Sequence, residues 1–284
     1  MSATVLRRSS HIPTPAPARL RLLHIVRSEF IKLASLRSIV LSLATIVVTG
    51  LGISLALALT MESAGVPSQP SAEFLLWTVT FGAYMLGQLV AALLGVLAVS
   101  GEYSAGTIQP ALLSVPSRLP VLAAKALAVF TVSTGAGLVA TVGSWAVTYP
   151  LFDELGLAVG LGEPGVALAL AGTAVYLGLV SVFALGVATA VRSAAGGITI
   201  VVMVLLILPV AVGMLGGAVQ WVSDATPYLL SNAGESMTFI ADTAATSDPD
   251  WSGPLSPSLG ALVVLAWSAI SLAIGAALLR GRDV

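Results

Sequence analysis

Residues 166–191 read VALALAGTAVYLGLVSVFALGVATAV and contain no charged side chain. An α-helix rises about 1.5 Å per residue, so a run of this length can cross the roughly 30 Å hydrocarbon core of a bilayer. Leucine, alanine and valine follow one another here without period-two alternation, and the run is too long for a strand of a membrane β-barrel. The stretch therefore predicts a transmembrane helix.

Five further stretches of the chain have the same character. The 284 residues are 57% hydrophobic and only 9% charged, whereas a soluble domain carries about 25% charged residues. Pro209 lies in the middle of one of these stretches, where we expect a kink. We predict an all-α polytopic membrane protein with a transmembrane domain over residues 38–284. Its six transmembrane helices are expected at about residues 38–60, 74–100, 124–149, 166–191, 196–219 and 259–279.

The charged residues give these spans a direction. If the N-terminus lies in the cytoplasm, all 12 lysine and arginine residues fall on the cytoplasmic side, with Arg118 and Lys125 in the loop between the second and third spans. Cytoplasmic loops are enriched in lysine and arginine, so both termini are predicted to be cytoplasmic. The three opposite loops hold only acidic charges, namely Glu62, Glu73, Asp153, Glu154, Glu163, Asp224, Glu235, Asp242, Asp248 and Asp250.

Two segments precede the first span. Residues 1–18 are rich in Ser, Thr, Pro and Arg and predict a disordered cytoplasmic tail. Residues 19–37 predict an amphipathic interface helix, suited to the headgroup layer of an anionic leaflet. This helix either anchors the chain only or also packs against a cytoplasmic partner. Its expected apolar side comprises Leu22, Leu23, Val26, Phe30, Leu33 and Ala34, and its polar side comprises Arg21, His24, Arg27, Ser28, Lys32 and Ser35.

Two loops are unusual in composition. Residues 101–120, GEYSAGTIQPALLSVPSRLP, are broken into short pieces by glycine and proline. Glu102 stands where a helix leaves the bilayer, and there it either meets a cationic partner or is solvated by headgroups and water. The external loop over residues 220–258 is rich in apolar and aromatic residues. We expect it to form short interfacial or re-entrant helices in the outer leaflet.

The residue inventory excludes several kinds of chemistry. The chain has no cysteine, and its two histidines, His11 and His24, both lie near the N-terminus. It lacks the GxxxxGK[ST] phosphate loop, so no nucleotide site is expected. We therefore predict no catalytic, cofactor-binding or metal-binding residues, and a chain that is not an enzyme.

Three motifs resemble the permease subunits of bacterial type-2 ABC exporters. The first, at residues 27–37, is Arg-Ser-Glu-Phe-Ile-Lys-Leu followed by Leu36-Arg37. The second, at residues 101–108, is Gly-Glu-Tyr-Ser-Ala-Gly-Thr-Ile. The third, Pro-Tyr-Leu-Leu-Ser-Asn-Ala-Gly at residues 227–234, is similar to segments of actinobacterial members. With the six spans, the resemblance covers about residues 20–284.

This resemblance implies partners and a site. In such exporters the pre-membrane helix and the second-to-third loop dock onto a separate ATPase. The expected assembly is two identical permease chains with two ATPase chains that bind ATP and Mg²⁺. Membrane lipid is the remaining expected partner, nucleic acid is not expected, and the expected location is a bacterial plasma membrane. Residues carried over to the ATPase-coupling surface are Glu102, Tyr103, Gly106, Thr107, Arg27, Glu29 and Lys32.

Two other functions compete with this interpretation. An ion- or proton-coupled secondary carrier would act without an ATPase, but such carriers place ionisable groups at mid-membrane, and the six predicted spans lack them there. An intramembrane enzyme would need a buried nucleophile with a base, or metal ligands, and no span supplies these. The uncharged spans favour a lipid-like or amphipathic natural product or drug as the substrate.

Overall fold

The structure is a computed structural model that describes residues 22–64, 72–104, 118–216, 219–240 and 255–281. Its described residues form helices and no strands, and six helical segments are long and apolar enough to cross a membrane. The prediction of an all-α polytopic membrane protein is confirmed. The segments are α2 (Arg37–Ala64), α3–η1–α4 (Ala72–Gly82, Ala83–Gly87 and Gln88–Ser104), α6 (Arg118–Glu154), α7 (Val166–Val191), α8–η2–α9 (Ala194–Val202, Met203–Ile207 and Leu208–Gly216) and α13 (Pro257–Gly281).

The third span, α6, differs most from the expected bounds of 124–149. It begins at Arg118 because Pro120 lies in the first turn, where the missing N–H is not needed for an intrahelical hydrogen bond. It also continues past Pro150 to Glu154. Arg118 and Lys125 were both counted among the charges of the second-to-third loop, but both lie within α6, and Lys125 also falls inside the expected bounds of 124–149.

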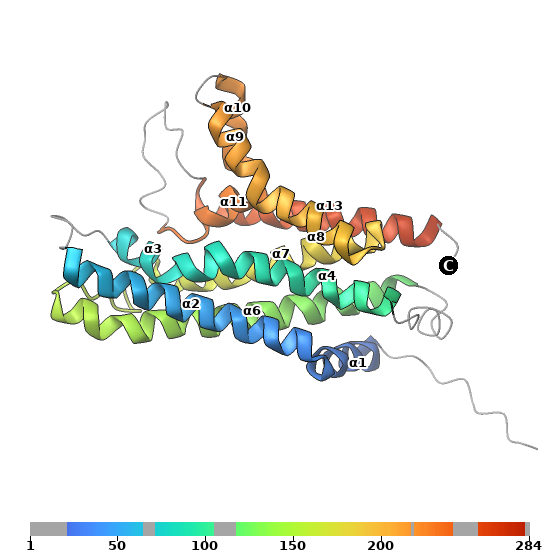
Figure 1. Cartoon of the computed structure of the whole chain (residues 1–284), viewed down its shortest axis with the longest axis horizontal. Helices are drawn as coiled ribbons and strands as arrows, with labels where there is room; N and C mark the ends of the chain where they lie inside the picture. The colour runs from blue at the N-terminus through green and yellow to red at the C-terminus, as the bar shows by residue number, and fades with distance from the viewer. Residues whose placement is uncertain (1–21, 65–71, 105–117, 217–218, 241–254, 282–284) are drawn as a thin grey trace, which may run out of the picture.

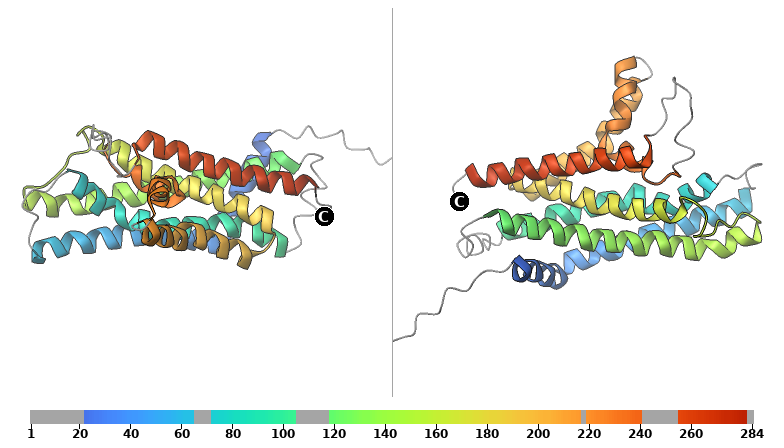
Figure 2. Two further views of the ribbon diagram at one scale, coloured as in Figure 1. Left: turned by 90° about the horizontal axis from the view of Figure 1, so that it is seen from above. Right: turned by 180° about the vertical axis from the view of Figure 1, so that it is seen from behind.

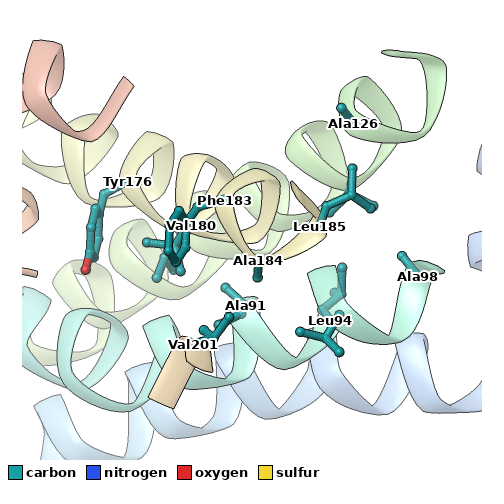
Figure 3. Close-up of a cluster of buried hydrophobic side chains, with 14 of the residues drawn as sticks. Ala91, Leu94, Ala98, Ala126, Tyr176, Val180, Phe183, Ala184, Leu185 and Val201 are labelled. Carbon is teal, nitrogen blue, oxygen red and sulfur yellow. The ribbon is translucent and has the colours of Figure 1, made fainter. Parts of the chain in front are cut away.

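α7 is the centre of the bundle and packs against α4, α6 and α13. Its buried side chains include Val180 and Phe183, which face Ala91 and Val201 in the core (Figure 3). Glycine allows the closest helix approach: a Cβ at Gly95 in α4 would overlap the backbone carbonyl of Ser181 in α7. Small residues at such contacts provide the van der Waals packing that holds membrane helices together.

The fifth span follows the bundle only along its first half. α8 packs against α4 and α7, and the chain then turns outward at the π-helical turn η2, directly before Pro209. Figures 1 and 2 show α9 and the short α10 (Gln220–Ala225) projecting away from the other helices. The sequence predicts a kink at Pro209, and both the π-turn and the proline explain the bend.

After α10 the chain returns to the bundle through short helices. η3 (Thr226–Tyr228) leads into α11 (Leu230–Ser236), which packs against the start of α13. The Trp267 Nε1–H donates a hydrogen bond of 3.1 Å to the Tyr228 carbonyl. This bond holds the returning chain against α13. These are short helices of the kind that the sequence predicts for the fifth-to-sixth loop.

The pre-membrane helix α1 (Leu22–Ser35) lies across the predicted cytoplasmic end of the bundle (Figure 2). The helical pattern breaks at Leu36, and α2 then begins at Arg37. Although α1 leads directly into α2, it packs mainly against α6. The predicted interface helix therefore belongs structurally to the third span as much as to the first. The predicted tail over residues 1–18 lies outside the described residues.

Candidate functional site

A buried ion pair joins α1 to α6. The Glu29 carboxylate accepts a hydrogen bond from Lys125 Nζ to Oε2 at 2.6 Å and another from Lys32 Nζ to Oε1 at 2.6 Å. Glu29 is 1% exposed and Lys125 is 4% exposed. Charged groups removed from water in this way require close partners. We call this contact the Glu29–Lys125 ion pair.

The face of α1 that meets the bundle differs from the predicted apolar side. Glu29 and Leu33, one helical turn apart, are both buried. Leu23, assigned to the apolar side, is 77% exposed, and Ile31 is also exposed. The reason is that Lys125 compensates Glu29, which lets an acidic residue rather than a leucine occupy the contact with α6. The outer side of α1 is left partly apolar.

The predicted coupling residues have different outcomes in the structure. Glu29 and Lys32 are in contact, whereas Arg27 lies on the exposed side of α1. Glu102 and Tyr103 belong to the last turn of α4. Gly106 and Thr107 lie outside the described residues. The ATPase-coupling role assigned to all seven remains a prediction. The sequence pattern missed Lys125 as a member of this site, because it counted that residue as a loop charge.

A second group of polar residues lies where α11 meets the bundle, and we call it the polar cluster: Tyr84, Gln88, Tyr176, Ser231 and Glu235. The Tyr84 hydroxyl donates to the Ser231 carbonyl at 3.1 Å, and the Tyr176 hydroxyl donates to Gln88 Oε1. The rings of Tyr84 and Tyr176 are 5.8 Å apart between centroids. The cluster thus connects η1, α4, α7 and α11.

Two glycines allow α11 to pack closely against this cluster and against α13. Gly234 lies so close to the Tyr176 ring that a Cβ at this position would overlap it. On the opposite element, a Cβ at Gly260 of α13 would overlap Ser236 and the Ala233 carbonyl. The buried side of α11 is therefore fitted to α7 and α13, while Asn232 and Glu235, three residues apart on the helix, remain partly exposed.

The position of α11 brings Glu235 deep into the bundle. Tyr84 lies ten residues from the start of the second span at Phe74, and Tyr176 lies ten residues from the start of the fourth span at Val166. At about 1.5 Å per residue, both are about 15 Å from the predicted external ends of their helices, or about half of a 30 Å hydrocarbon core. Glu235 was expected to be an external loop charge, but it approaches this depth on a re-entrant helix.

The surroundings of Glu235 disfavour its ionised form. Burial raises the pKa of the Glu235 carboxyl above its ordinary value of 4.5, and a hydrogen bond with Tyr84 acts in the opposite direction. Neither influence comes from a basic residue. Sequence reasoning missed this residue as a site member because it inspected only the spans for ionisable groups. The apolar composition of residues 220–258 was the signal that pointed to it.

Two comparisons with known proteins bear on this arrangement. Residues 23–284 match a family model described as "ABC-2 family transporter protein". No curated protein matches the chain. Within the described residues, no group of three or more His, Cys, Asp or Glu side chains is placed to hold a metal ion.

Proposed function

Because the chain belongs to the ABC-2 transporter family and is the permease of an ABC transporter, we propose that it forms the substrate path of an ATP-driven exporter in a bacterial inner membrane. Membership of the family implies association with an ABC ATPase. In our proposal that separate chain binds ATP and Mg²⁺, and hydrolysis takes place there. The permease converts the movement of its partner into the opening and closing of a path, without covalent chemistry of its own.

The Glu29–Lys125 ion pair is the observation that carries the coupling proposal. It fastens α1 to α6, which is the first helix described after the second-to-third loop. A push from the ATPase on residues 19–37 and 101–120 would therefore reach the third span directly, in addition to the first, second and fifth spans. Buried charges in good geometry resist separation, because parting them leaves a desolvated charge without a partner. This property suits a joint that transmits force.

The fifth span supports a second copy of the chain as a partner. Only 11% of its most apolar window is buried within the chain, against 67% for the fourth span. None of the residues of α9 is buried. Because α9 projects from its own bundle, its apolar side chains are available for packing, and an identical permease chain could cover them. We propose a homodimer with two ATPase chains, which would place two fifth spans next to the path.

The side chains that remain exposed on the fifth span support the proposed substrate class. Met203, Ile207 and Met214 on the fifth span are each more than half exposed. A path lined by such side chains suits a lipid-like or amphipathic natural product or drug, because an apolar body gains free energy on leaving water.

The test is purification of the full chain from its native membrane in detergent, with mass spectrometry of the proteins that accompany it. We expect a soluble ABC ATPase in the eluate, and we expect Glu102→Ala combined with Gly106→Pro to remove it. Arg280→Ala is the matched control, since Arg280 is an exposed basic residue near the C-terminus, and it should retain the ATPase.

The opposite result would support a different class of transporter. A chain that purifies without an ATPase and moves substrate alone in liposomes would be a secondary carrier. Glu235 provides a specific reason to run this assay, because it supplies an ionisable group near mid-membrane that the spans themselves lack. Transport by the permease alone that depends on a proton gradient would therefore overturn the ATP-driven proposal.

A further inference from the structure

Among the described residues, Glu235 makes no ion pair with a lysine, arginine or histidine. The sequence places every lysine, arginine and histidine on the predicted cytoplasmic side of the six spans, and it places Glu235 on the opposite side. An identical second chain would have the same distribution and could not supply the charge either. An ionised carboxylate at this depth is costly unless it is paired. A positive charge that balances the ionised form of Glu235 would therefore come from outside the permease.

The hydrogen bonds of the polar cluster lead to the same conclusion. Tyr84 has one hydroxyl proton and two acceptors beside it, the Ser231 carbonyl and the Glu235 carboxylate. The Tyr176 proton is already donated to Gln88. When Glu235 is protonated, it can donate to the Tyr84 oxygen and every group is satisfied. When Glu235 is ionised, the cluster is one donor short.

The site is open on one side. Glu235 and Asn232 form the partly exposed face of α11, and Tyr84 is also partly exposed. α11 packs against η2, and this segment of the fifth span presents Met203 and Ile207 at its surface. A π-helical turn occurs at η1 beside Tyr84 and a second at η2, and such turns are frequent at functional sites. One carboxylate and an aromatic ring therefore stand next to apolar surface from two spans.

We propose that Glu235 and Tyr84 form a recognition site for the cationic group of an apolar substrate, an organic cation carried through this permease. The inference rests on the proposed function in that the chain forms the substrate path. A carboxylate balances the positive charge, the Tyr84 ring adds aromatic surface that attracts cations, and apolar side chains receive the remainder of the molecule. A bare metal ion would need about six oxygen ligands, more than the polar cluster offers.

Binding of a cation at this site has a defined pH dependence. The carboxylate must be ionised to bind, so affinity should rise with pH as Glu235 loses its proton and then become constant. The other titratable groups facing Glu235 are Tyr84 of η1 and Tyr176 of α7, which stay protonated over the range used. Among the described residues, α13 and η2 place no titratable side chain there, since Arg280 lies at the opposite end of α13.

The experiment uses the full chain in lipid nanodiscs with radiolabelled tetraphenylphosphonium as the probe and empty nanodiscs as the blank. We expect binding at pH 8, weaker binding at pH 5, and a loss of at least tenfold in affinity at pH 8 in Glu235→Gln. The matched control is Asp224→Asn, which removes an exposed acidic charge on the same predicted side and should leave the affinity unchanged. The affinity for the neutral comparator, triphenylphosphine oxide, should not change with either substitution.

Several outcomes would overturn the proposal. Equal affinity of the parent chain and Glu235→Gln would exclude the carboxylate, and so would binding that does not change with pH. Loss of the neutral comparator together with the cation would indicate a packing defect rather than charge recognition. If Glu235→Gln does not fold, the parent chain alone keeps the test decisive, because equal binding of the cation at pH 5 and pH 8 would exclude the carboxylate. No ATPase takes part, so a negative result here leaves the co-purification test of the proposed function unaffected.

Discussion

Glu29 and Glu235 are both acidic residues set against the helical bundle, Glu29 at its predicted cytoplasmic end and Glu235 in its predicted outer half. Glu29 is 1% exposed and has two lysines at 2.6 Å, one of them buried with it. Glu235 is partly exposed and has a tyrosine hydroxyl beside it, which it shares with a backbone carbonyl. The described residues thus supply basic partners for Glu29 and none for Glu235.

This difference separates a structural joint from a binding site. A carboxylate whose lysines belong to the same chain fixes two helices to one another, and its removal should lower the stability of the folded chain. A carboxylate without such a cation contributes little to holding helices together. Its removal should instead lower the affinity for a bound cation and change the pH dependence of stability. The predictions below test this contrast, from the largest expected effect to the smallest.

Lys125→Met should be the most destabilising of these substitutions. It leaves the Glu29 carboxylate buried with only the half-exposed Lys32 beside it, and breaking one side of a buried ion pair costs about 3–5 kcal/mol. Unfolding by denaturant in detergent micelles measures this loss. Glu29→Met combined with Lys125→Met should recover most of the stability, because well-packed apolar residues can replace a buried pair. A double variant as unstable as the single one would show that the two charges do not act as a pair.

Gly234→Ala should be less costly but still clearly destabilising. The added methyl group would overlap the Tyr176 ring, and overpacking of this kind costs about 1–3 kcal/mol. By displacing α11 it should also weaken any binding at Glu235. The matched control is Gly52→Ala in α2, where a Cβ meets nothing within 4 Å, so the stability should be unchanged or slightly higher. Equal effects at the two glycines would contradict the close seating of α11.

The sequence predicted the number and character of the spans because each is a long, continuous apolar run, and a bilayer imposes that requirement on every spanning helix. It located α1 and the short helices between the fifth and sixth spans for related reasons. It did not predict which charges meet. Lys125 was separated from Glu29 by 96 positions, and Glu235 was counted as an external charge because its loop folds back into the bundle. Such contacts depend on tertiary packing, which periodicity does not encode.

Glu235→Gln should change the pH dependence of stability more than stability itself. Because the pKa of Glu235 is raised in the folded chain, the folded state holds this proton more tightly than the unfolded state. Stability should therefore fall as pH rises from about 4.5 through the raised pKa, and Glu235→Gln should remove that decline. At low pH the variant should lie within about 1 kcal/mol of the parent, since glutamine preserves the shape and hydrogen bonding of the neutral acid. Thermal unfolding at several pH values measures both effects, and a decline that persists in the variant would assign it to another group.

Lys32→Met should have the smallest effect of the series. Its side chain is 43% exposed, and it lies three residues from Glu29 on the same helix. A pair at this spacing on one helix contributes about 0.2–0.5 kcal/mol when water and salt screen one of its charges, as they do at Lys32. The same substitution made together with Lys125→Met should cost considerably more, since Glu29 would then lose both of these lysines, and contacts that share a partner are not additive. Denaturant unfolding of the four combinations gives the coupling directly. If Lys32→Met costs the same with and without Lys125, the two lysines do not share the Glu29 carboxylate, and the joint between α1 and α6 depends on Lys125 alone.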